Sequence, residues 1–318
     1  MIFVGVISCF IYTKHCADRY RQRLEILLLE DLIHATGTCN TRNEYIFAGL
    51  KLPRFSMKIH DFKRKKQEQK KISMLTCYDY PSACTIAESQ IDCVLVGDSV
   101  AMAVHGHQNT IMATMEMMTL HTQAVARGIK QQFLVTDLPF LSHKASREQT
   151  IHHVTTLLQA GAHGIKIEGG DDDTCKTITH LVHAGVPIMG HIGLTPQSIH
   201  QLGGFKVQGK SDEQAELLVQ QACKLEAAGC FAIVIECVPQ QVARQITEAL
   251  TIPTIGIGAG NATDGQVLVW HDLLGLQTDF NPRFVKRYAQ GKELFIEAIN
   301  SYAQQVQQQS FPTAEYAF

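Results

Sequence analysis

The sequence lacks the features that would assign it to a membrane or nucleic-acid-binding class of protein. A membrane-spanning helix needs ~20 apolar residues, and the longest apolar run, MIFVGVISCFIYT at the start, is shorter. That run has no basic segment before it and no clear cleavage site, so it makes a poor signal peptide. The formal net charge is -2 at pH 7. The charge balance therefore shows no basic footprint for nucleic acid or an anionic membrane.

The sequence also lacks the cysteine and histidine spacings of disulfide frameworks and zinc sites. It has 10 cysteines but no C-x-x-C pair, and 15 histidines but no H-E-x-x-H motif. Cys93, Cys230 and Cys237 lie in or beside apolar segments, where free thiols pack as small hydrophobic side chains. We therefore predict reduced cysteines and a cytoplasmic protein. Most histidines are expected on the surface or in loops.

The most informative feature that is present is a set of apolar segments that each end on a carboxylate. VLVGDS, LVTDLP, IKIEGG and VIECVP end at Asp98, Asp137, Glu168 and Glu236, which are 39, 31 and 68 residues apart. A further segment, VPIMGHIG, places His191 between the last two acids. One strand, one helix and their two turns need about 30–40 residues. The spacing therefore predicts a repeated strand–helix unit with one functional residue at the end of each strand.

Strand and helix patterns alternate from residue 72 onwards. The expected strands are residues 73–77, 93–97, 133–137, 164–168, 186–190, 231–236 and 252–258, with an eighth near 276–280. Residues 147–160 and 212–228 have apolar residues at helical spacing, and a glycine follows each segment. Continuously apolar strands indicate a parallel sheet covered by helices. An open doubly wound sheet is the alternative, but the number of units and the periodic acids favour a closed (β/α)8 barrel in a single domain.

The first 56 residues show neither a sustained period nor a repeat. Met57 opens a segment that is typical of a helix leading into the first strand. We therefore expect an N-terminal extension over residues 1–56 that is not part of the fold, and a catalytic barrel over residues 57–318. An upstream reading-frame artefact and a membrane anchor are alternatives for the extension. The basic run KRKK at 63–66, with Lys70 and Lys71, is expected to form a solvated helix face.

Longer motifs reveal a resemblance to a known family. LVGDS, DLPF, KIEGG, GHIGLTPQS, GGFKVQG, LEAAG, IECVP, ALTIPTIGIGAG and DGQVLVWHD occur in the order seen in ketopantoate hydroxymethyltransferases, from about Met57 onwards. The resemblance implies a TIM barrel of the phosphoenolpyruvate/pyruvate type. It also implies transfer of a hydroxymethyl group from 5,10-methylenetetrahydrofolate to 3-methyl-2-oxobutanoate, giving 2-dehydropantoate (ketopantoate) on the route to pantothenate. One Mg²⁺ per subunit and a homodecamer, assembled as a pentamer of dimers, are further implications.

The chemistry explains why these residue types are needed. Forming a bond at C3 of a branched 2-oxo acid requires removal of a proton beside a ketone, and a cation with oxygen ligands stabilises the resulting enolate. The resemblance implies a magnesium site at Asp98, Asp137 and Glu168, with direct or water-mediated coordination. It implies substrate binding by Asp98, Ser99, Asp137 and Lys166. Catalytic roles fall to Glu236 as the proton acceptor, together with Lys166 and His191.

Each assignment has an alternative. A single acid just after a strand is also commonly a helix cap or a partner in a loop ion pair. Lys166 pairs either with a substrate oxygen or with a neighbouring acid, and His191 orients substrate, supports the base or is structural. For the whole chain, one alternative is a magnesium-dependent 2-oxo acid lyase or aldolase of the same superfamily that uses no folate. Another is a non-catalytic barrel that serves in assembly.

Overall fold

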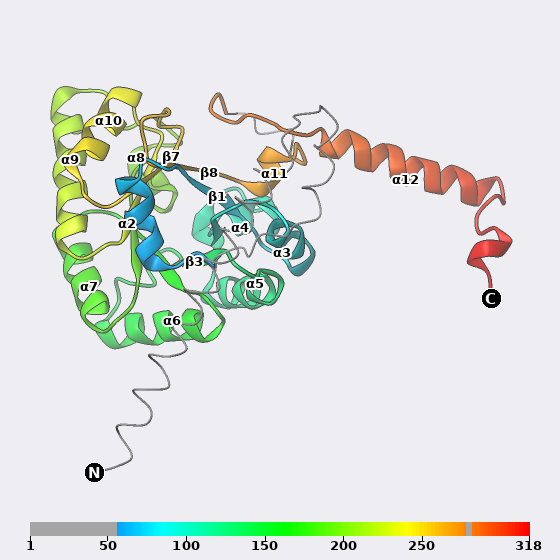
Figure 1. Ribbon diagram of the computed structural model, residues 1–318, viewed down its shortest axis with the longest axis horizontal. Coiled ribbons are helices and arrows are strands. Elements are labelled where there is room, and N and C mark those ends of the chain that lie inside the picture. The colour runs from blue at the N-terminus through cyan, green and yellow to red at the C-terminus, as the bar shows by residue number, and fades with distance from the viewer. Residues whose placement is uncertain (1–55, 278–281) are drawn as a thin grey trace, which may run out of the picture. The chain divides into compact units, whose positions relative to one another are not determined.

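The computed structural model describes residues 56–277 and 282–318 (Figure 1). Eight parallel strands close into a barrel in sequence order, so the predicted (β/α)8 fold class is confirmed. The strands are β1 (Ile72–Thr76), β2 (Cys93–Val96), β3 (Phe133–Asp137), β4 (Gly164–Glu168), β5 (Ile188–Gly193), β6 (Ala232–Glu236), β7 (Thr254–Ile257) and β8 (Gly265–Leu268). The prediction for residues 1–55 lies outside the described residues.

Helices cover the outside of the barrel after each of the first six strands. They are α3 (Tyr80–Ala87), α5 (Met115–Gly128), α6 (Arg147–Gln159), α7 (Asp172–His183), α9 (Asp212–Ala227) and α10 (Gln240–Ala249). Shorter elements are α4 (Val100–Ala103), η3 (Thr110–Met112), η4 (Pro196–Ser198), α8 (Ile199–Leu202), α11 (Trp270–Leu273) and η5 (Ala314–Tyr316). The helices predicted at 147–160 and 212–228 are confirmed as α6 and α9.

Five covering helices begin at a residue whose side chain accepts a hydrogen bond from a backbone N–H of the first turn. These caps are Asp79 for α3, Thr114 for α5, Ser146 for α6, Asp171 for α7 and Ser211 for α9. A cap of this kind is worth about 1 kcal/mol. The caps therefore determine locally where each strand-to-helix loop ends, and they leave the acids at the strand ends available for other contacts.

The eighth strand is not where the sequence pattern placed it, so that prediction was wrong. β8 lies at Gly265–Leu268, where Ile72 of β1 is in register with Gly265. Residues 258–264 between β7 and β8 form no helix. Because no helix separates β7 from β8, the regular strand–helix spacing predicted the eighth strand too far towards the C-terminus. In addition, Gln266 is exposed on the outer face, so the segment does not read as a continuously apolar strand.

Helix α2 (Ile59–Gln67) closes the N-terminal end of the barrel. Its Phe62 is fully buried and packs edge-on against Phe133 and Phe231, with ring centroids 5.3 and 4.9 Å away. Burial of one phenylalanine side chain stabilises a fold by ~1.5–3 kcal/mol. The predicted helix before the first strand is therefore present, and it acts as a plug opposite the functional end of the barrel.

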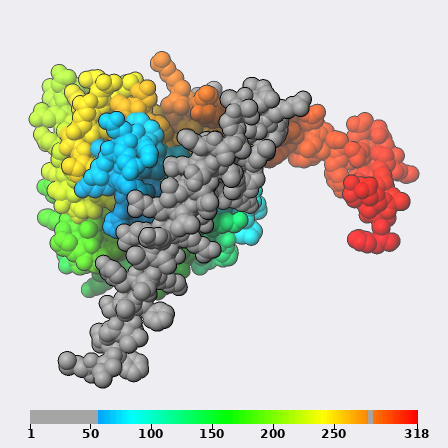
Figure 2. Space-filling view, in the orientation of Figure 1, coloured from blue at the N-terminus to red at the C-terminus, as the bar shows by residue number. Residues whose placement is uncertain are grey.

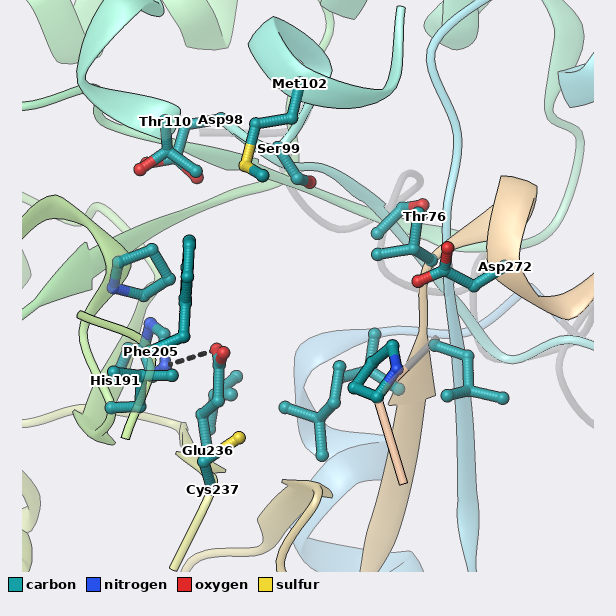
Figure 3. Close-up of a pocket in the computed structure, with 18 of the residues that line it drawn as sticks. Thr76, Asp98, Ser99, Met102, Thr110, His191, Phe205, Glu236, Cys237 and Asp272 are labelled. Atoms are coloured by element: carbon teal, nitrogen blue, oxygen red, sulfur yellow. Dashed lines mark ion pairs between the residues drawn. The ribbon is translucent and has the colours of Figure 1, made fainter. Parts of the chain in front are cut away.

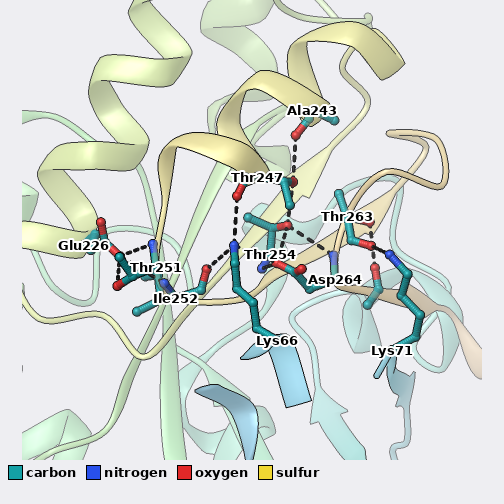
Figure 4. Close-up of polar contacts among 11 residues, drawn as sticks. Lys66, Lys71, Glu226, Ala243, Thr247, Thr251, Ile252, Thr254, Thr263 and Asp264 are labelled. Atoms are coloured by element: carbon teal, nitrogen blue, oxygen red, sulfur yellow. Dashed lines mark hydrogen bonds and ion pairs between the residues drawn. The ribbon is translucent and has the colours of Figure 1, made fainter. Parts of the chain in front are cut away.

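The basic run on α2 is only partly solvated, so the prediction for it was partly wrong. Lys66 Nζ donates to the carbonyls of Thr247 and Ile252 at 2.8 and 3.0 Å and pairs with Asp264 at 3.0 Å (Figure 4). The blue atoms of α2 adjoin the yellow atoms near α10 in Figure 2. Lys65 pairs with Asp92 at 2.6 Å. One face of the helix lies on the barrel, and its lysines therefore bind the loops at that end.

Two further observations bear on the class of protein. In the part of the chain that is described, no helix combines the length and the apolar character needed to cross a membrane. The seven described cysteines carry free thiols, and three of them, Cys77, Cys93 and Cys230, are buried. Burial raises the pKa of each of these three thiols, as expected for inert packing residues.

Candidate active site

The carboxyl ends of the strands open onto one pocket with a cavity volume of about 400 Å³. In a closed parallel barrel all strands present these ends on the same face. The pocket is lined by all seven residues that the sequence singled out: Asp98, Ser99, Asp137, Lys166, Glu168, His191 and Glu236. Figure 3 shows Asp98 and Ser99 on one side of the pocket, and His191 and Glu236 on another.

Lys166 is the central cation of the pocket. It lies on β4, two residues before Glu168, so both side chains point to the same face of the strand. Its Nζ is 3.2 Å from Asp137 Oδ1 and 3.7 Å from Glu168 Oε1, and its side chain is 5% exposed. Burial alone lowers the pKa of Lys166, but the charges of Asp137 and Glu168 outweigh it and raise this pKa. Lys166 is therefore positively charged at neutral pH.

Asp98 and Asp137 lie next to each other at the ends of β2 and β3. The backbone N–H of Asp98 donates to Asp137 Oδ2 at 3.1 Å. Burial and neighbouring carboxylates raise the pKa of Asp98, and burial raises the pKa of Asp137. Neither acid caps a helix, because the residue preceding α4 is Ser99 and that preceding α6 is Ser146. The cap alternative is thus contradicted for both acids.

His191 connects two acids across neighbouring strands. Its Nδ1 is 3.1 Å from Glu168 Oε1, and its Nε2 is 3.2 Å from Glu236 Oε2 (Figure 3). Burial and Lys166 lower the pKa of His191, but Glu168 and Glu236 prevail and raise it to about 9. The imidazole is therefore protonated at neutral pH. Burial would raise the pKa of Glu168, but His191 and Lys166 lower it overall, so Glu168 is ionised.

Ser99 is held by a buried tyrosine that the sequence did not single out. The hydroxyl groups of Ser99 and Tyr78 are 2.8 Å apart, and Tyr78 is 1% exposed. Burial raises the pKa of Tyr78, so its hydroxyl stays protonated. Because Tyr78 follows β1 and Ser99 follows β2, the pairing of these two neighbouring strands brings the two hydroxyl groups together.

Gln197 is a second residue that the sequence reasoning missed. Its side-chain amide donates to Asp98 Oδ2 at 2.8 Å and to the Leu138 carbonyl at 2.9 Å. Its backbone N–H donates to Glu168 Oε2 at 3.1 Å. It lies in the motif GHIGLTPQS. The only sequence signal for a role of Gln197 was that it is a polar residue shortly after a strand. Gln197 thus orients acids from two other strands.

The charges of the pocket favour a divalent cation. The two cations Lys166 and His191 face four carboxyl groups, which leaves a formal charge of two negatives when all are ionised: Asp98, Asp137, Glu168 and Glu236. Asp137 Oδ1 is buried 3.2 Å from Lys166 Nζ and has no second donor within the described residues. Carboxylate oxygens are the ligands that Mg²⁺ prefers. The donor set and the charge therefore fit one magnesium ion.

The described residues contain no complete protein cage for such an ion. No three His, Cys, Asp or Glu side chains among residues 56–277 and 282–318 are grouped to hold a metal by themselves. Lys166 lies within ion-pair distance of Asp137 and Glu168. Mg²⁺ is commonly held by one or two carboxylates, with waters and substrate oxygens completing its shell. Asp98 and Asp137, which a 3.1 Å hydrogen bond joins, suit that arrangement.

Comparisons with solved structures agree with the fold. A putative phosphonomutase from Burkholderia cenocepacia J2315 has a TM-score of 0.54 and 14% identity, over 80% of this chain and 99% of that chain. 2,3-Dimethylmalate lyase, a member of the PEP mutase/isocitrate lyase superfamily, has a TM-score of 0.52 and 13% identity, over 82% and 91%. At these identities the likeness shows the barrel type alone.

Sequence comparisons are far closer. The profile of ketopantoate hydroxymethyltransferase matches residues 56–314. The 3-methyl-2-oxobutanoate hydroxymethyltransferase of Legionella pneumophila (strain Paris) is 74% identical over 262 residues, covering 82% of this chain and all of the relative. That of Francisella tularensis subsp. novicida (strain U112) is 52% identical over 257 residues, covering 81% and 97%. The chain therefore belongs to the ketopantoate hydroxymethyltransferase family.

Proposed function

We propose that this enzyme makes ketopantoate through an enolate of 3-methyl-2-oxobutanoate, with Glu236 as the base and 5,10-methylenetetrahydrofolate as the donor. Membership of the family assigns hydroxymethyl transfer to this keto acid, on the route to pantothenate. The observation that carries the mechanism is the ion pair between His191 Nε2 and Glu236 Oε2 at 3.2 Å, facing the pocket. The substrate is proposed to bind beside this carboxylate.

Glu236 suits the role of base better than His191. A histidine whose pKa is about 9 already carries its proton at neutral pH and accepts no other. The imidazolium instead orients the Glu236 carboxylate, whose side chain is 17% exposed and open to the pocket. A general base must lie within hydrogen-bond reach of the proton it removes. His191 is thus proposed as a positioning residue. Of the three roles considered for it, this one is support of the base.

The substrate carboxylate and keto oxygen would bind on the other side of the pocket. Ser99 contributes a hydroxyl that Tyr78 orients, and Lys166 contributes a buried positive charge. We propose that Asp98, Asp137 and Glu168 hold one Mg²⁺ there. When bound, the ion would supply Lewis-acid stabilisation of negative charge on the substrate oxygens. Lys166 adds its positive charge to the same region. It would therefore pair both with its acid neighbours and with the substrate oxygens.

The proposed steps balance in atoms and charge. The Glu236 carboxylate takes the proton from C3, and that electron pair moves onto the keto oxygen. The enolate then returns the pair to form the new carbon–carbon bond with the one-carbon unit of the donor. Both carbon–nitrogen bonds of the donor's methylene bridge break, and its two nitrogens take up two protons, the one that left C3 and one from water. The same water supplies the hydroxyl group. The products are ketopantoate and tetrahydrofolate.

The proton abstraction can be tested without the donor. In deuterated water, the enzyme with Mg²⁺ and 3-methyl-2-oxobutanoate should exchange the C3 hydrogen, read by loss of its proton NMR signal. Glu236→Gln keeps the shape of the side chain but cannot accept a proton at neutral pH. It should slow exchange and transfer by about 10²–10⁴-fold, the usual contribution of a positioned base. Glu248→Gln, on the exposed face of α10, is the matched control. Normal exchange in the Glu236 variant would refute its role.

The two alternative functions have less support. The lyase among the structural neighbours is 13% identical, whereas the transferases are 74% and 52% identical. A barrel kept only for assembly has no need of buried acids with raised pKa values, such as Asp98 and Asp137. Burying these acids costs folding free energy. A catalytic role explains why they are present despite that cost, and a role in assembly alone does not.

We also propose that residues 57–318 form the complete catalytic unit. The family profile begins at residue 56, and Met57 is 8% exposed. The Met57 backbone N–H donates to the Gln131 carbonyl at 2.7 Å. A chain that starts at Met57 is expected to fold and to turn over substrate like the full chain. Loss of activity in that shorter chain would contradict the proposal.

Assembly into a homo-oligomer, a homodecamer by family resemblance, is proposed from the C-terminal helix α12 (Gly291–Gln307). Phe295, Ile299, Tyr302 and Val306 recur at helical spacing, and their exposed fractions are 55, 64, 59 and 44%. Such a stripe is usual for a helix that packs on another surface. Free buried thiols such as Cys93 are maintained in a reducing compartment, which supports a cytoplasmic location.

A further inference from the structure

The pocket is larger than the keto acid requires. Its volume of about 400 Å³ lies in the range that holds drug-sized ligands, whereas 3-methyl-2-oxobutanoate has a chain of only four carbons with one methyl branch. The residues proposed to handle the keto acid come from β2 to β6. The part of the pocket formed by β7, β8 and β1 therefore has no assigned occupant.

One buried carboxylate lies in that unassigned part. Asp272 belongs to α11, directly after β8, and lines the pocket. It is 7% exposed, and its Oδ1 has no hydrogen-bond partner within the described residues. Figure 3 shows Asp272 beside Thr76, across the pocket from His191 and Glu236. A buried acceptor without a donor is destabilising, so a ligand that brings N–H donors would satisfy this oxygen.

The fold holds this carboxylate in place. The Trp270 backbone N–H donates to Thr76 Oγ1 at 2.9 Å, which ties the start of α11 to the end of β1. The Asp272 carbonyl accepts from the Gly275 N–H at 3.1 Å, which closes the turn after the helix. Burial raises the pKa of Asp272, and the charge of Arg287 offsets only part of that effect. The side chain is therefore positioned by backbone contacts and lacks a full set of partners.

The walls around Asp272 are apolar. Ile257 at the end of β7 and Leu268 at the end of β8, with Val269 after it, line the pocket next to the start of α11. A ligand that fits here has a flat apolar body and N–H donors at the edge that meets Asp272. Two exposed cations, Lys206 and Arg283, line the same pocket. They suit an anionic tail on that ligand.

We propose that Asp272 binds the pterin ring of the one-carbon donor, accepting hydrogen bonds from its ring N3–H and its exocyclic 2-amino group. These two donors are adjacent and parallel, which matches the two oxygens of a carboxylate as a guanidinium does. The glutamate tail of the donor carries the negative charges that Lys206 and Arg283 suit. This inference rests on the proposed function, since it takes methylenetetrahydrofolate as the donor.

The test measures binding of tetrahydrofolate by calorimetry to the full chain with Mg²⁺ present. Asp272→Asn should weaken it by about 10–100-fold, as expected for a lost charged hydrogen-bond pair. A 2-desamino-2-methyl analogue of tetrahydrofolate should bind the unmodified enzyme correspondingly weakly. In the Asn variant that discrimination between the two ligands should disappear. Asp173→Asn, on the exposed start of α7, is the matched control.

Steady-state kinetics and thermal unfolding of the Asp272 variants provide the second part of the test. Asp272→Asn and Asp272→Glu should raise the KM for the donor far more than the KM for the keto acid. Both variants should retain the thermal midpoint and the keto-acid affinity of the unmodified enzyme, which shows that they fold. Equal affinity of tetrahydrofolate for the Asn variant and the unmodified enzyme would overturn the inference. So would a variant that loses keto-acid binding to the same extent.

The proposed function and this inference fail in different ways. If the unmodified enzyme does not exchange the C3 hydrogen, the enolate mechanism fails whatever tetrahydrofolate does. If exchange and transfer proceed in the unmodified enzyme but Asp272→Asn binds tetrahydrofolate normally, the inference alone fails. In that case Asp272 serves another partner, such as an arginine of the same chain.

Discussion

Gln197 donates a hydrogen bond of 2.8 Å to Asp98 Oδ2, although 99 residues separate the two in the chain. The backbone N–H of Gln197 also donates to Glu168 Oε2. The loop after β5 therefore holds acids from β2 and β4 in one arrangement. An acid cluster that repels itself needs such donors to keep a defined geometry.

Gln197→Met should disorganise this cluster. The methionine has similar length but cannot donate, so Asp98 Oδ2 and the Leu138 carbonyl lose a partner. We expect the free energy of unfolding, measured in urea, to fall by about 1–3 kcal/mol, and the KM for the keto acid to rise. Gln220→Met, on the exposed face of α9, controls for the chemical change. A variant with unchanged stability and unchanged KM would show that the contact has no role.

Asp98→Asn should separate metal binding from folding. Burial and the charges of Glu168 and Asp137 raise the pKa of Asp98, so removing its charge relieves repulsion. In a chelator, the thermal midpoint should therefore stay equal or rise. Excess Mg²⁺ at about 100 times its Kd should stabilise the unmodified enzyme by about 2.7 kcal/mol, with no such effect on the variant. Turnover of the variant should fall at least about 100-fold. Equal stabilisation of both proteins by Mg²⁺ would place the ion elsewhere.

His143 should make stability depend on pH. It is 6% exposed, and neither ring nitrogen has a hydrogen-bond partner within the described residues. Burial and then Lys144 lower the pKa of His143 to about 4 from 6.5. Between these two values the unfolded chain binds a proton here and the folded chain does not. The free energy of unfolding should therefore fall as the pH drops through this window, by about 2–4 kcal/mol in all.

A substitution can show whether His143 causes the loss of stability between pH 6.5 and pH 4. His143→Phe removes the titrating group, so the loss of stability from pH 6.5 to pH 4 should shrink relative to the unmodified enzyme, measured by urea unfolding at each pH. His152→Phe, on the exposed side of α6, should leave the dependence intact. An identical pH dependence in the His143 variant would assign the effect to other groups.

The stripe on α12 should hold the assembly together. Phe295→Glu with Ile299→Glu places two charges on the exposed apolar face, where burial against another subunit would leave them unpaired. Light scattering after size exclusion should show a lower mass than for the unmodified enzyme. Gln304→Glu adds a charge to an exposed polar position of the same helix and should not change the mass. An unaltered mass in the double variant would remove α12 from the interface.

Much of this protein followed from the sequence. Apolar segments ending on Asp98, Asp137, Glu168 and Glu236 predicted both the barrel and the members of the pocket, because strand and helix periods are local properties of the chain. Lys166 and Glu168, two residues apart on β4, both line the pocket and lie 3.7 Å from each other. Parallel strands in a barrel present their carboxyl ends together, and local pattern was therefore enough to name these residues.

Tertiary structure decided what the local pattern could not. β8 at Gly265–Leu268 was missed because no helix precedes it and Gln266 faces outwards. Tyr78, Gln197 and Asp272 acquire their places in the pocket only when the strands assemble, because the residues around them come from other strand–helix units. The protonation of His191 likewise depends on Glu168 and Glu236 lying on either side of it. A pKa is set by burial and by charges in space, and neither quantity is encoded in the spacing of residues along the chain.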